Sequence, residues 1–93
     1  MMVSAILLMT VTRGMVAQLG SDLADVPGVT EVFSVAGRYD LAVLIRVKSP
    51  DELAELVTGT IGQFDHITST ETLIAFKVYS RHDLEAMFSI GNS

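Results

Sequence analysis

The sequence predicts one α+β domain, in which a four-stranded antiparallel sheet carries two helices on one face. Three observations support this fold class. A strand-like segment followed by a helix-like segment occurs twice, and two of the four expected strands are apolar on both faces. A short polar turn joins the second and third strands along the chain. The 93 residues, 1–93, are therefore expected to form a single domain, with a core at about 3–79 and a tail at 80–93.

Composition limits the classes of function. The hydrophobic fraction of 49% and the mean hydropathy of +0.48 are high for a small domain, so we expect part of the surface to be buried against a second copy. Cysteine is absent, which excludes disulfides and cysteine-based metal or nucleophile chemistry. The formal net charge is −5 and the six basic residues do not cluster, so direct nucleic-acid binding is not expected.

No segment is expected to enter a membrane. The longest apolar run, at residues 5–9, is far shorter than the roughly 20 residues that a membrane-spanning helix needs. It also lacks the basic leader and the cleavage site of a signal peptide. We therefore expect a cytoplasmic protein without a membrane partner.

The first strand is predicted at Val3–Val11, and its middle is apolar on both faces. Thr12 is the expected N-cap of a helix at residues 13–24, because apolar residues recur there at helical spacing. Pro27 and Gly28 then end the helix and lead into the next strand.

A hairpin is predicted from residues 29–35 and Leu41–Val47, which are both rich in β-branched and aromatic residues. Gly37 can adopt a positive φ without a Cβ clash, and Asp40 can bind nearby backbone amides. These two residues therefore suit the tight reversal between the strands. The second hairpin strand is again apolar on both faces, so it should lie in the middle of the sheet.

The second helix should begin after Ser49 as N-cap, with Pro50 at the first position and Glu52 completing a capping box. Apolar residues at helical spacing continue to Phe64. A turn follows, and the fourth strand is predicted at residues 67–79. Its polar side chains Thr68, Thr70 and Thr72 are expected on the same side as Ile74, Phe76 and Val78. The segment 81–88 is expected to form a short helix or an edge strand that docks on this domain or a neighbour.

The resulting order, βαββαβ with two right-handed crossovers, predicts the ferredoxin-like sandwich. In that topology the first and third strands are central, which agrees with their apolar character on both faces. The sheet face without helices would expose Ile6, Leu8, Ala42 and Leu44, or the residues on the opposite faces of those strands. A monomer rarely leaves such a patch open, so we expect two sheets to pack back to back in a dimer.

The hairpin at residues 32–41, with its turn Gly37-Arg38-Tyr39-Asp40, and the Thr-rich start of Ile67–Ile74 resemble the effector-binding domain of the Lrp/AsnC (leucine-responsive) regulators. The resemblance covers roughly residues 3–79, and Arg38 departs from the acidic residue often found in the family's G-x-Y-D turn. It implies a non-catalytic, oligomerising regulatory domain linked to transcription regulation, in the stand-alone form without a helix-turn-helix. Dimers would assemble into an octamer or decamer ring, with a small amino acid bound where dimers meet, and could co-assemble with a full-length regulator.

The resemblance and the chemistry together indicate a candidate ligand site. An amino acid needs donors for its carboxylate and an acceptor for its ammonium, which backbone amides, a carboxylate and hydroxyls can supply. The alternative is ordinary turn chemistry and the β-propensity of threonine. The candidate residues are Gly37, Arg38, Tyr39, Asp40, Thr68, Ser69, Thr70 and Thr72.

Two other functions are compatible with the fold class. Small dimeric monooxygenases and isomerases share it, but His66 and His82 are isolated and no acid–base cluster is apparent. We therefore expect no catalytic residues, no metal and no cofactor. A purely structural assembly module with an empty pocket is the other alternative.

Overall fold

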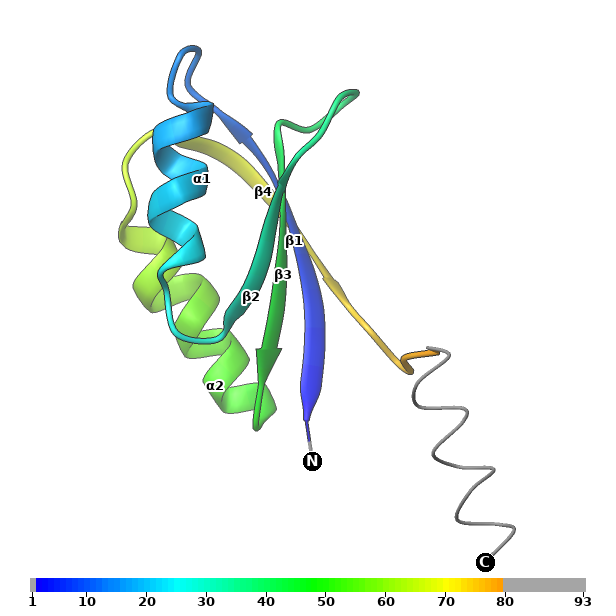
Figure 1. Ribbon diagram of the computed structural model, residues 1–93. Coiled ribbons are helices and arrows are strands. Elements are labelled where there is room, and N and C mark those ends of the chain that lie inside the picture. Colours follow the sequence, from blue (N-terminus) through cyan, green and yellow to red (C-terminus); the bar gives the residue numbers. More distant parts are fainter. Residues whose placement is uncertain (1, 80–93) are drawn as a thin grey trace, which may run out of the picture.

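The computed structural model of the chain describes residues 2–79. The predicted tail at 80–93, including the segment 81–88, lies outside these residues. The elements occur in the order β1 (Val3–Val11), α1 (Val16–Ala24), β2 (Val29–Ser34), β3 (Leu41–Val47), α2 (Pro50–Ala54), η1 (Glu55–Thr60), η2 (Ile61–Gln63) and β4 (Ile67–Ile74). Both helical segments cover the same face of one sheet (Figure 1).

The sheet has the strand order β2-β3-β1-β4, and every neighbouring pair is antiparallel. This arrangement confirms the predicted ferredoxin-like α+β fold and the central positions of β1 and β3. In the described part of the chain, no helix has the length and apolar character that a membrane crossing requires.

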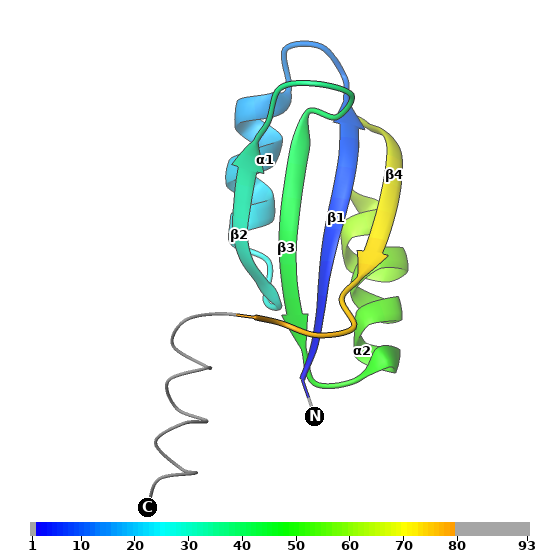
Figure 2. The same cartoon turned by 90° about the vertical axis from the view of Figure 1, so that its right-hand side faces the viewer.

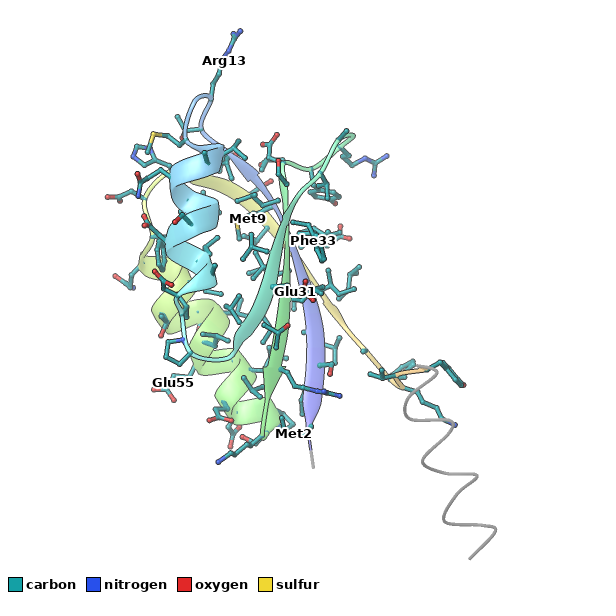
Figure 3. The ribbon with its side chains drawn as sticks, viewed as in Figure 1. Met2, Met9, Arg13, Glu31, Phe33 and Glu55 are labelled. Carbon is teal, nitrogen blue, oxygen red and sulfur yellow. The ribbon has the colours of Figure 1, made fainter. Side chains whose placement is uncertain are left out.

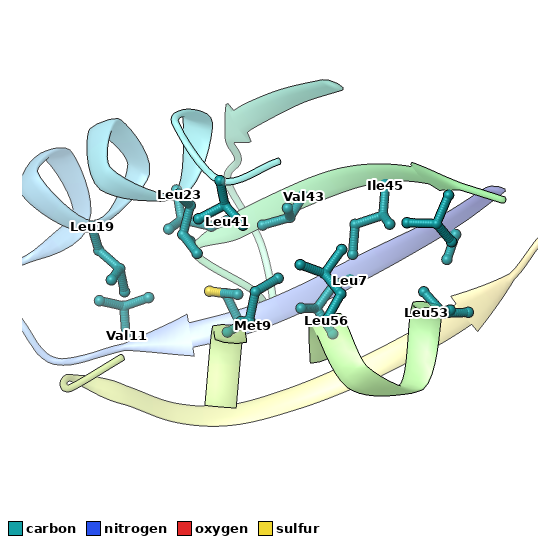
Figure 4. Close-up of a cluster of buried hydrophobic side chains, with 14 residues drawn as sticks. Leu7, Met9, Val11, Leu19, Leu23, Leu41, Val43, Ile45, Leu53 and Leu56 are labelled. Carbon is teal, nitrogen blue, oxygen red and sulfur yellow. The ribbon is translucent and has the colours of Figure 1, made fainter. Parts of the chain in front are cut away.

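The core lies between the helices and the inward-facing side chains of β1 and β3. Leu7 pairs with Val43 and Met9 with Leu41 across the two central strands, and all four side chains are buried. Figure 4 shows side chains from both helical segments packed against this layer. The buried helical residues are Leu19, Leu23, Leu53, Leu56 and Ile61.

The opposite face of the sheet is turned toward the viewer in Figure 2, and no helix covers it. Ile6 pairs with Leu44 and Leu8 with Ala42 across β1 and β3. These four residues are the first of the two sets that the sequence predicts for the face without helices. We call this surface the outer face. It comprises Ile6, Leu8, Phe33, Ala42, Leu44 and Leu73, of which Ile6 is 37%, Phe33 46% and Leu73 45% exposed.

The first helix begins later than predicted. Residues 13–14 form a turn in which Gly14 has φ +88°, a conformation that cannot continue a helix. The helix starts at Val16 after Met15, which makes no side-chain cap, so the predicted N-cap role of Thr12 is wrong. The backbone N–H of Thr12 donates instead to the carbonyl of His66 at 2.8 Å, which ties the end of β1 to the turn before β4.

The second helix begins after Ser49 as predicted, but it is less regular than its spacing indicates. The Glu52 carboxylate reaches back to Lys48 N and not to the Ser49 N–H of the predicted capping box. Ser49 Oγ accepts a hydrogen bond from Glu52 N at 3.1 Å, and Glu52 Oε2 accepts one from Lys48 N at 2.6 Å. Only Pro50–Ala54 is α-helical; a π-helical turn and a 3₁₀ turn follow, and Phe64 lies beyond the end. Thr58 Oγ1 donates to the carbonyl of Ala54 at 2.6 Å, a local bond that competes with regular helical pairing.

Two strands end earlier than predicted. β2 ends at Ser34 rather than at residue 35, and β4 ends at Ile74 rather than at residue 79. The register of β4 against β1 also shifts, because Thr10 pairs with Ser69 whereas Val11 pairs with Ile67. Thr68 is therefore the extra residue of a β-bulge, and it does not share a side with Thr70 and Thr72 as predicted.

Candidate functional site

The turn of the β2–β3 hairpin is held to β1 by Asp40. Its backbone N–H donates to the carbonyl of Met9 at 2.9 Å, and its carbonyl accepts from Val35 N at 3.0 Å. Its carboxylate Oδ2 accepts a hydrogen bond from Val11 N at 2.8 Å. β1 continues for two residues beyond Met9, which pairs with the first residue of β3, Leu41. The Asp40 carboxylate therefore accepts the hydrogen bond from Val11 N that a backbone carbonyl of β3 would otherwise accept. Asp40 thus has a structural role that local turn chemistry did not predict.

The tip of the turn is open. Gly37 has φ +124°, and a Cβ added there would meet no atom within 4 Å. Gly37 and the adjacent Arg38 are both exposed, so a ligand can approach the backbone at this turn.

Tyr39 links the hairpin tip to β4. Its hydroxyl donates to Glu71 Oε1 at 2.9 Å, although the hairpin and β4 lie on opposite sides of β1. This hydrogen bond raises the pKa of Tyr39 above its usual value of 10.0, and the negative charge of Glu71 acts in the same direction. The positive charge of Arg38 acts in the opposite direction and lowers that pKa. A carboxylate and a guanidinium therefore both lie near the Tyr39 hydroxyl.

A hydroxyl cluster lies beside this link on the outer side of the sheet. Thr10 Oγ1 lies 2.6 Å from Thr68 Oγ1 and 2.5 Å from Ser69 Oγ. Ser69 precedes Glu71 by two positions and faces the same way in the β4 strand. Sequence reasoning missed Thr10 because it sits in an apolar strand that has the pattern of core. Only the pairing of β1 with β4 reveals it.

Thr70 and Thr72 lie on the other face of β4. They pair with Met9 and Leu7, whose side chains point toward the helices. Thr70 lines a small cavity of about 130 Å³ between β4 and the second helical segment. The remaining cavity residues are Leu7, Val57, Ile61, Gly62, Phe64 and Ile67. The structure therefore places the Tyr39–Glu71 bond and the hydroxyls of Thr68 and Ser69 on the outer side of the sheet, and Thr70 and Thr72 on the opposite side.

His66 has a role in the backbone turn before β4. It has φ +76°, and its carbonyl accepts the bond from Thr12 in the turn before β4. Within residues 2–79, no three His, Cys, Asp or Glu side chains gather at metal-binding distances.

Glu71→Gln is expected to lower the pKa of Tyr39 toward 10.0, because the variant removes the negative charge that favours the neutral phenol. Ultraviolet titration of the phenolate, in a Tyr79→Phe background with one remaining tyrosine, measures this directly. The raised pKa means that this interaction stabilises the fold fully below pH 10 and is lost as the pH rises through the folded-state pKa. An unchanged Tyr39 titration in Glu71→Gln would contradict the link.

Comparison with known proteins identifies the family of this chain. Residues 4–84 match the family described as the Lrp/AsnC ligand binding domain. The chain is 33% identical over 75 residues to the HTH-type transcriptional regulator FL11 of Pyrococcus horikoshii, a match that covers 81% of this chain and 49% of that protein. The chain thus spans about half the length of the curated relatives it matches.

Solved structures agree with this match. The crystal structure of TTHA0845 from Thermus thermophilus superposes with a TM-score of 0.79 and 40% identity, covering 85% of this chain and 99% of that one. E. coli AsnC superposes with a TM-score of 0.78 over 84% of this chain and 53% of that one, and at 24% identity it supports the fold alone. The chain belongs to the Lrp/AsnC family, and residues 4–84 correspond to its ligand-binding domain.

Proposed function

We propose that this chain is a non-catalytic, cytoplasmic regulatory domain that binds a small amino acid and oligomerises, and that it acts in transcription regulation. Its membership in a family whose matched domain is described as ligand-binding supports the binding role. A fold neighbour at 11% identity, a transcriptional regulator from Neisseria meningitidis, was solved as an L-Met complex, which makes amino acids the first ligands to test.

The observation that carries the proposal is the hydrogen bond between Tyr39 and Glu71. It brings the hairpin tip to the hydroxyl-bearing strand β4 and places opposite charges, Arg38 and Glu71, near one phenol. An amino acid carries the matching pair of charges on its carboxylate and ammonium. The guanidinium and the open amides at Gly37 would bind the carboxylate, while Glu71 and the hydroxyls of Thr68 and Ser69 would receive the ammonium.

The other candidate residues take different parts in this proposal. Asp40 holds the hairpin in place through Val11, and its remaining acceptor capacity would serve the ammonium. Thr70 and Thr72 lie on the helix-facing side of β4. Because β4 is an edge strand, a ligand that extends around its open edge would reach them. One side of a ligand at the free edge of β4 would be exposed to solvent, and a neighbouring subunit would cover that side.

We propose that two copies pack through their outer faces to form a homodimer. Dimers then assemble into an octamer or decamer ring, with the amino acid bound where dimers meet. The exposed apolar residues of the outer face support the first step. The HTH-type regulators that this chain matches along about half of their length would be its co-assembly partners, since they carry the same type of domain.

Amino-acid binding is expected to raise the melting temperature of the protein and to change the mass of its oligomer. A thermal-shift screen of the standard amino acids at saturating concentration measures the first effect, and sedimentation with the best ligand measures the second. Arg38→Ala and Glu71→Gln should each weaken the response at least about tenfold in Kd, since each removes one charged contact. Gln18→Ala, an exposed change on α1, is the matched control. If no amino acid alters either quantity, the binding proposal is wrong.

A further inference from the structure

We infer that residues 75–79, which we call the arm, pack on the outer face of a second copy of this chain in a reciprocal exchange. This inference goes beyond the proposed sheet-to-sheet dimer, because it assigns a function to the segment that follows β4. The sequence predicted that this segment continues the strand.

The arm leaves its own sheet abruptly. Ala75 N donates to the carbonyl of Ser4 at 2.9 Å, which is the last bond that ties this segment to β1. In Figure 2 the arm runs across the lower ends of β1 and β3, and in Figure 1 it stands off from the sheet on the side away from the helices. It therefore projects into the space in front of the outer face.

The arm is apolar and uncovered. Phe76 is fully exposed, at 107% of its reference area, and Val78 and Tyr79 are also exposed. Keeping such side chains in water is unfavourable, and three of them within four residues is more than isolated surface residues require. The arm does not cover its own outer face, because Ile6, Phe33 and Leu73 remain exposed with the arm present.

The size of the outer face favours a partner that also engages the arm. Four strands about 4.8 Å apart and about six residues long, at about 3.3 Å per residue, present a projected area of roughly 400 Å². Stable interfaces bury about 800 Å² per partner, so the sheet alone is small for a lasting dimer. The exposed aromatic side chains Phe76 and Tyr79 of the arm can each bury about 150–250 Å², which together is close to the difference.

The outer side of the sheet offers acidic groups to the arm. It carries Glu31 on β2 and Glu71 on β4, together with one basic residue, Arg46 on β3, and Glu31 projects to the same side as Phe33 in Figure 3. The arm carries Lys77 between its apolar residues, with Nζ 5.3 Å from the centre of the Tyr79 ring. A two-fold axis places the arm of each copy over the sheet of the other, where the lysine meets acidic side chains. Such an interface is self-complementary, as a closed dimer requires.

Thiol cross-linking tests the exchange cleanly, because the natural sequence has no cysteine. Copies with Phe76→Cys are mixed and equilibrated with differently tagged copies carrying Ile6→Cys or Phe33→Cys, and a short bifunctional thiol reagent is added. We expect cross-links between the two tagged chains for at least one of these pairs. Gln18→Cys, on the helix layer, is the matched control and should give none with Cys at position 76.

A second variant measures the contribution of the arm to the dimer. Phe76→Ser combined with Val78→Ser should raise the dimer dissociation constant at least about tenfold, whereas Ala17→Ser on α1 should leave it unchanged. Circular dichroism checks that both variants remain folded. Dimers that persist with an unchanged dissociation constant and without cross-links to the arm would overturn the exchange, while leaving the sheet-to-sheet dimer in place. A monomeric natural protein would overturn it as well.

Discussion

Leu7→Ala is expected to lower the free energy of unfolding by about 2–5 kcal/mol, the usual cost of deleting a buried leucine and leaving a cavity. Leu7 is 0% exposed, lies at the centre of β1 and pairs with Val43 on one side and Thr72 on the other. A small domain has only about 5–15 kcal/mol of stability, so this single change should bring the protein close to unfolding. Urea and thermal denaturation followed by circular dichroism measure the loss.

Ile6→Ala is the matched control for this prediction. The residue is adjacent in the same strand and of the same size, but it belongs to the outer face and is 37% exposed. At protein concentrations where the chain is monomeric, we expect a cost below about 1.5 kcal/mol, because little area is uncovered. At higher concentrations the same variant should weaken the dimer. Equal losses from both variants in the monomer would show that the two faces of β1 are not distinct.

The arrangement of the sheet could be predicted from residue pattern alone. β1 and β3 are apolar on both faces, as expected of the two central strands of a βαββαβ sheet, whose inner side chains are the most deeply buried under the helices. The observed order β2-β3-β1-β4 follows from that pattern together with the right-handed crossover rule. The N-cap at Ser49 was also predictable, because its bond to Glu52 is local.

The errors occurred where the backbone departs from regular geometry. The positive φ of Gly14 delays α1, the π-helical turn at Glu55–Thr60 interrupts the second helix, and the bulge at Thr68 shifts the register of β4. Each depends on one or two residues within an otherwise regular pattern. Hydrophobic periodicity averages over a longer window and cannot resolve such local changes.

The candidate site was only partly predictable for a related reason. Local chemistry identified the hairpin tip and the hydroxyls of β4, but their partners are distant in sequence. Tyr39 bonds Glu71 across β1, and Thr10 bonds Ser69 across a strand pair. Strict alternation along β4 predicts Thr68 on the same side as Thr70 and Thr72, and the bulge at Thr68 breaks that alternation. Contacts between residues so far apart follow from the register of the sheet, which the sequence specifies only through the whole fold.

Asp40→Ala is expected to lower the free energy of unfolding by about 1.5–3 kcal/mol, because it removes the charged acceptor of the hydrogen bond from Val11 N at the end of β1. The loss should appear as a lower melting temperature, and opening of the hairpin neck should speed amide exchange at Val11. Hydrogen exchange followed by NMR measures the local effect. The exchange rate in the core, for example at Val43, should change only in proportion to the global loss.

Asp40→Asn separates this structural role from the proposed contact with a ligand. The amide oxygen of asparagine can still accept from Val11 N, so most of the stability should return, whereas the negative charge is absent. If Asp40 also pairs with the ammonium of an amino acid, Asp40→Asn should bind that ligand at least about tenfold more weakly while remaining folded and dimeric. Full affinity in Asp40→Asn would limit this residue to the hairpin neck. Glu71, which accepts the hydrogen bond from Tyr39, would then be the proposed acidic partner of the ammonium.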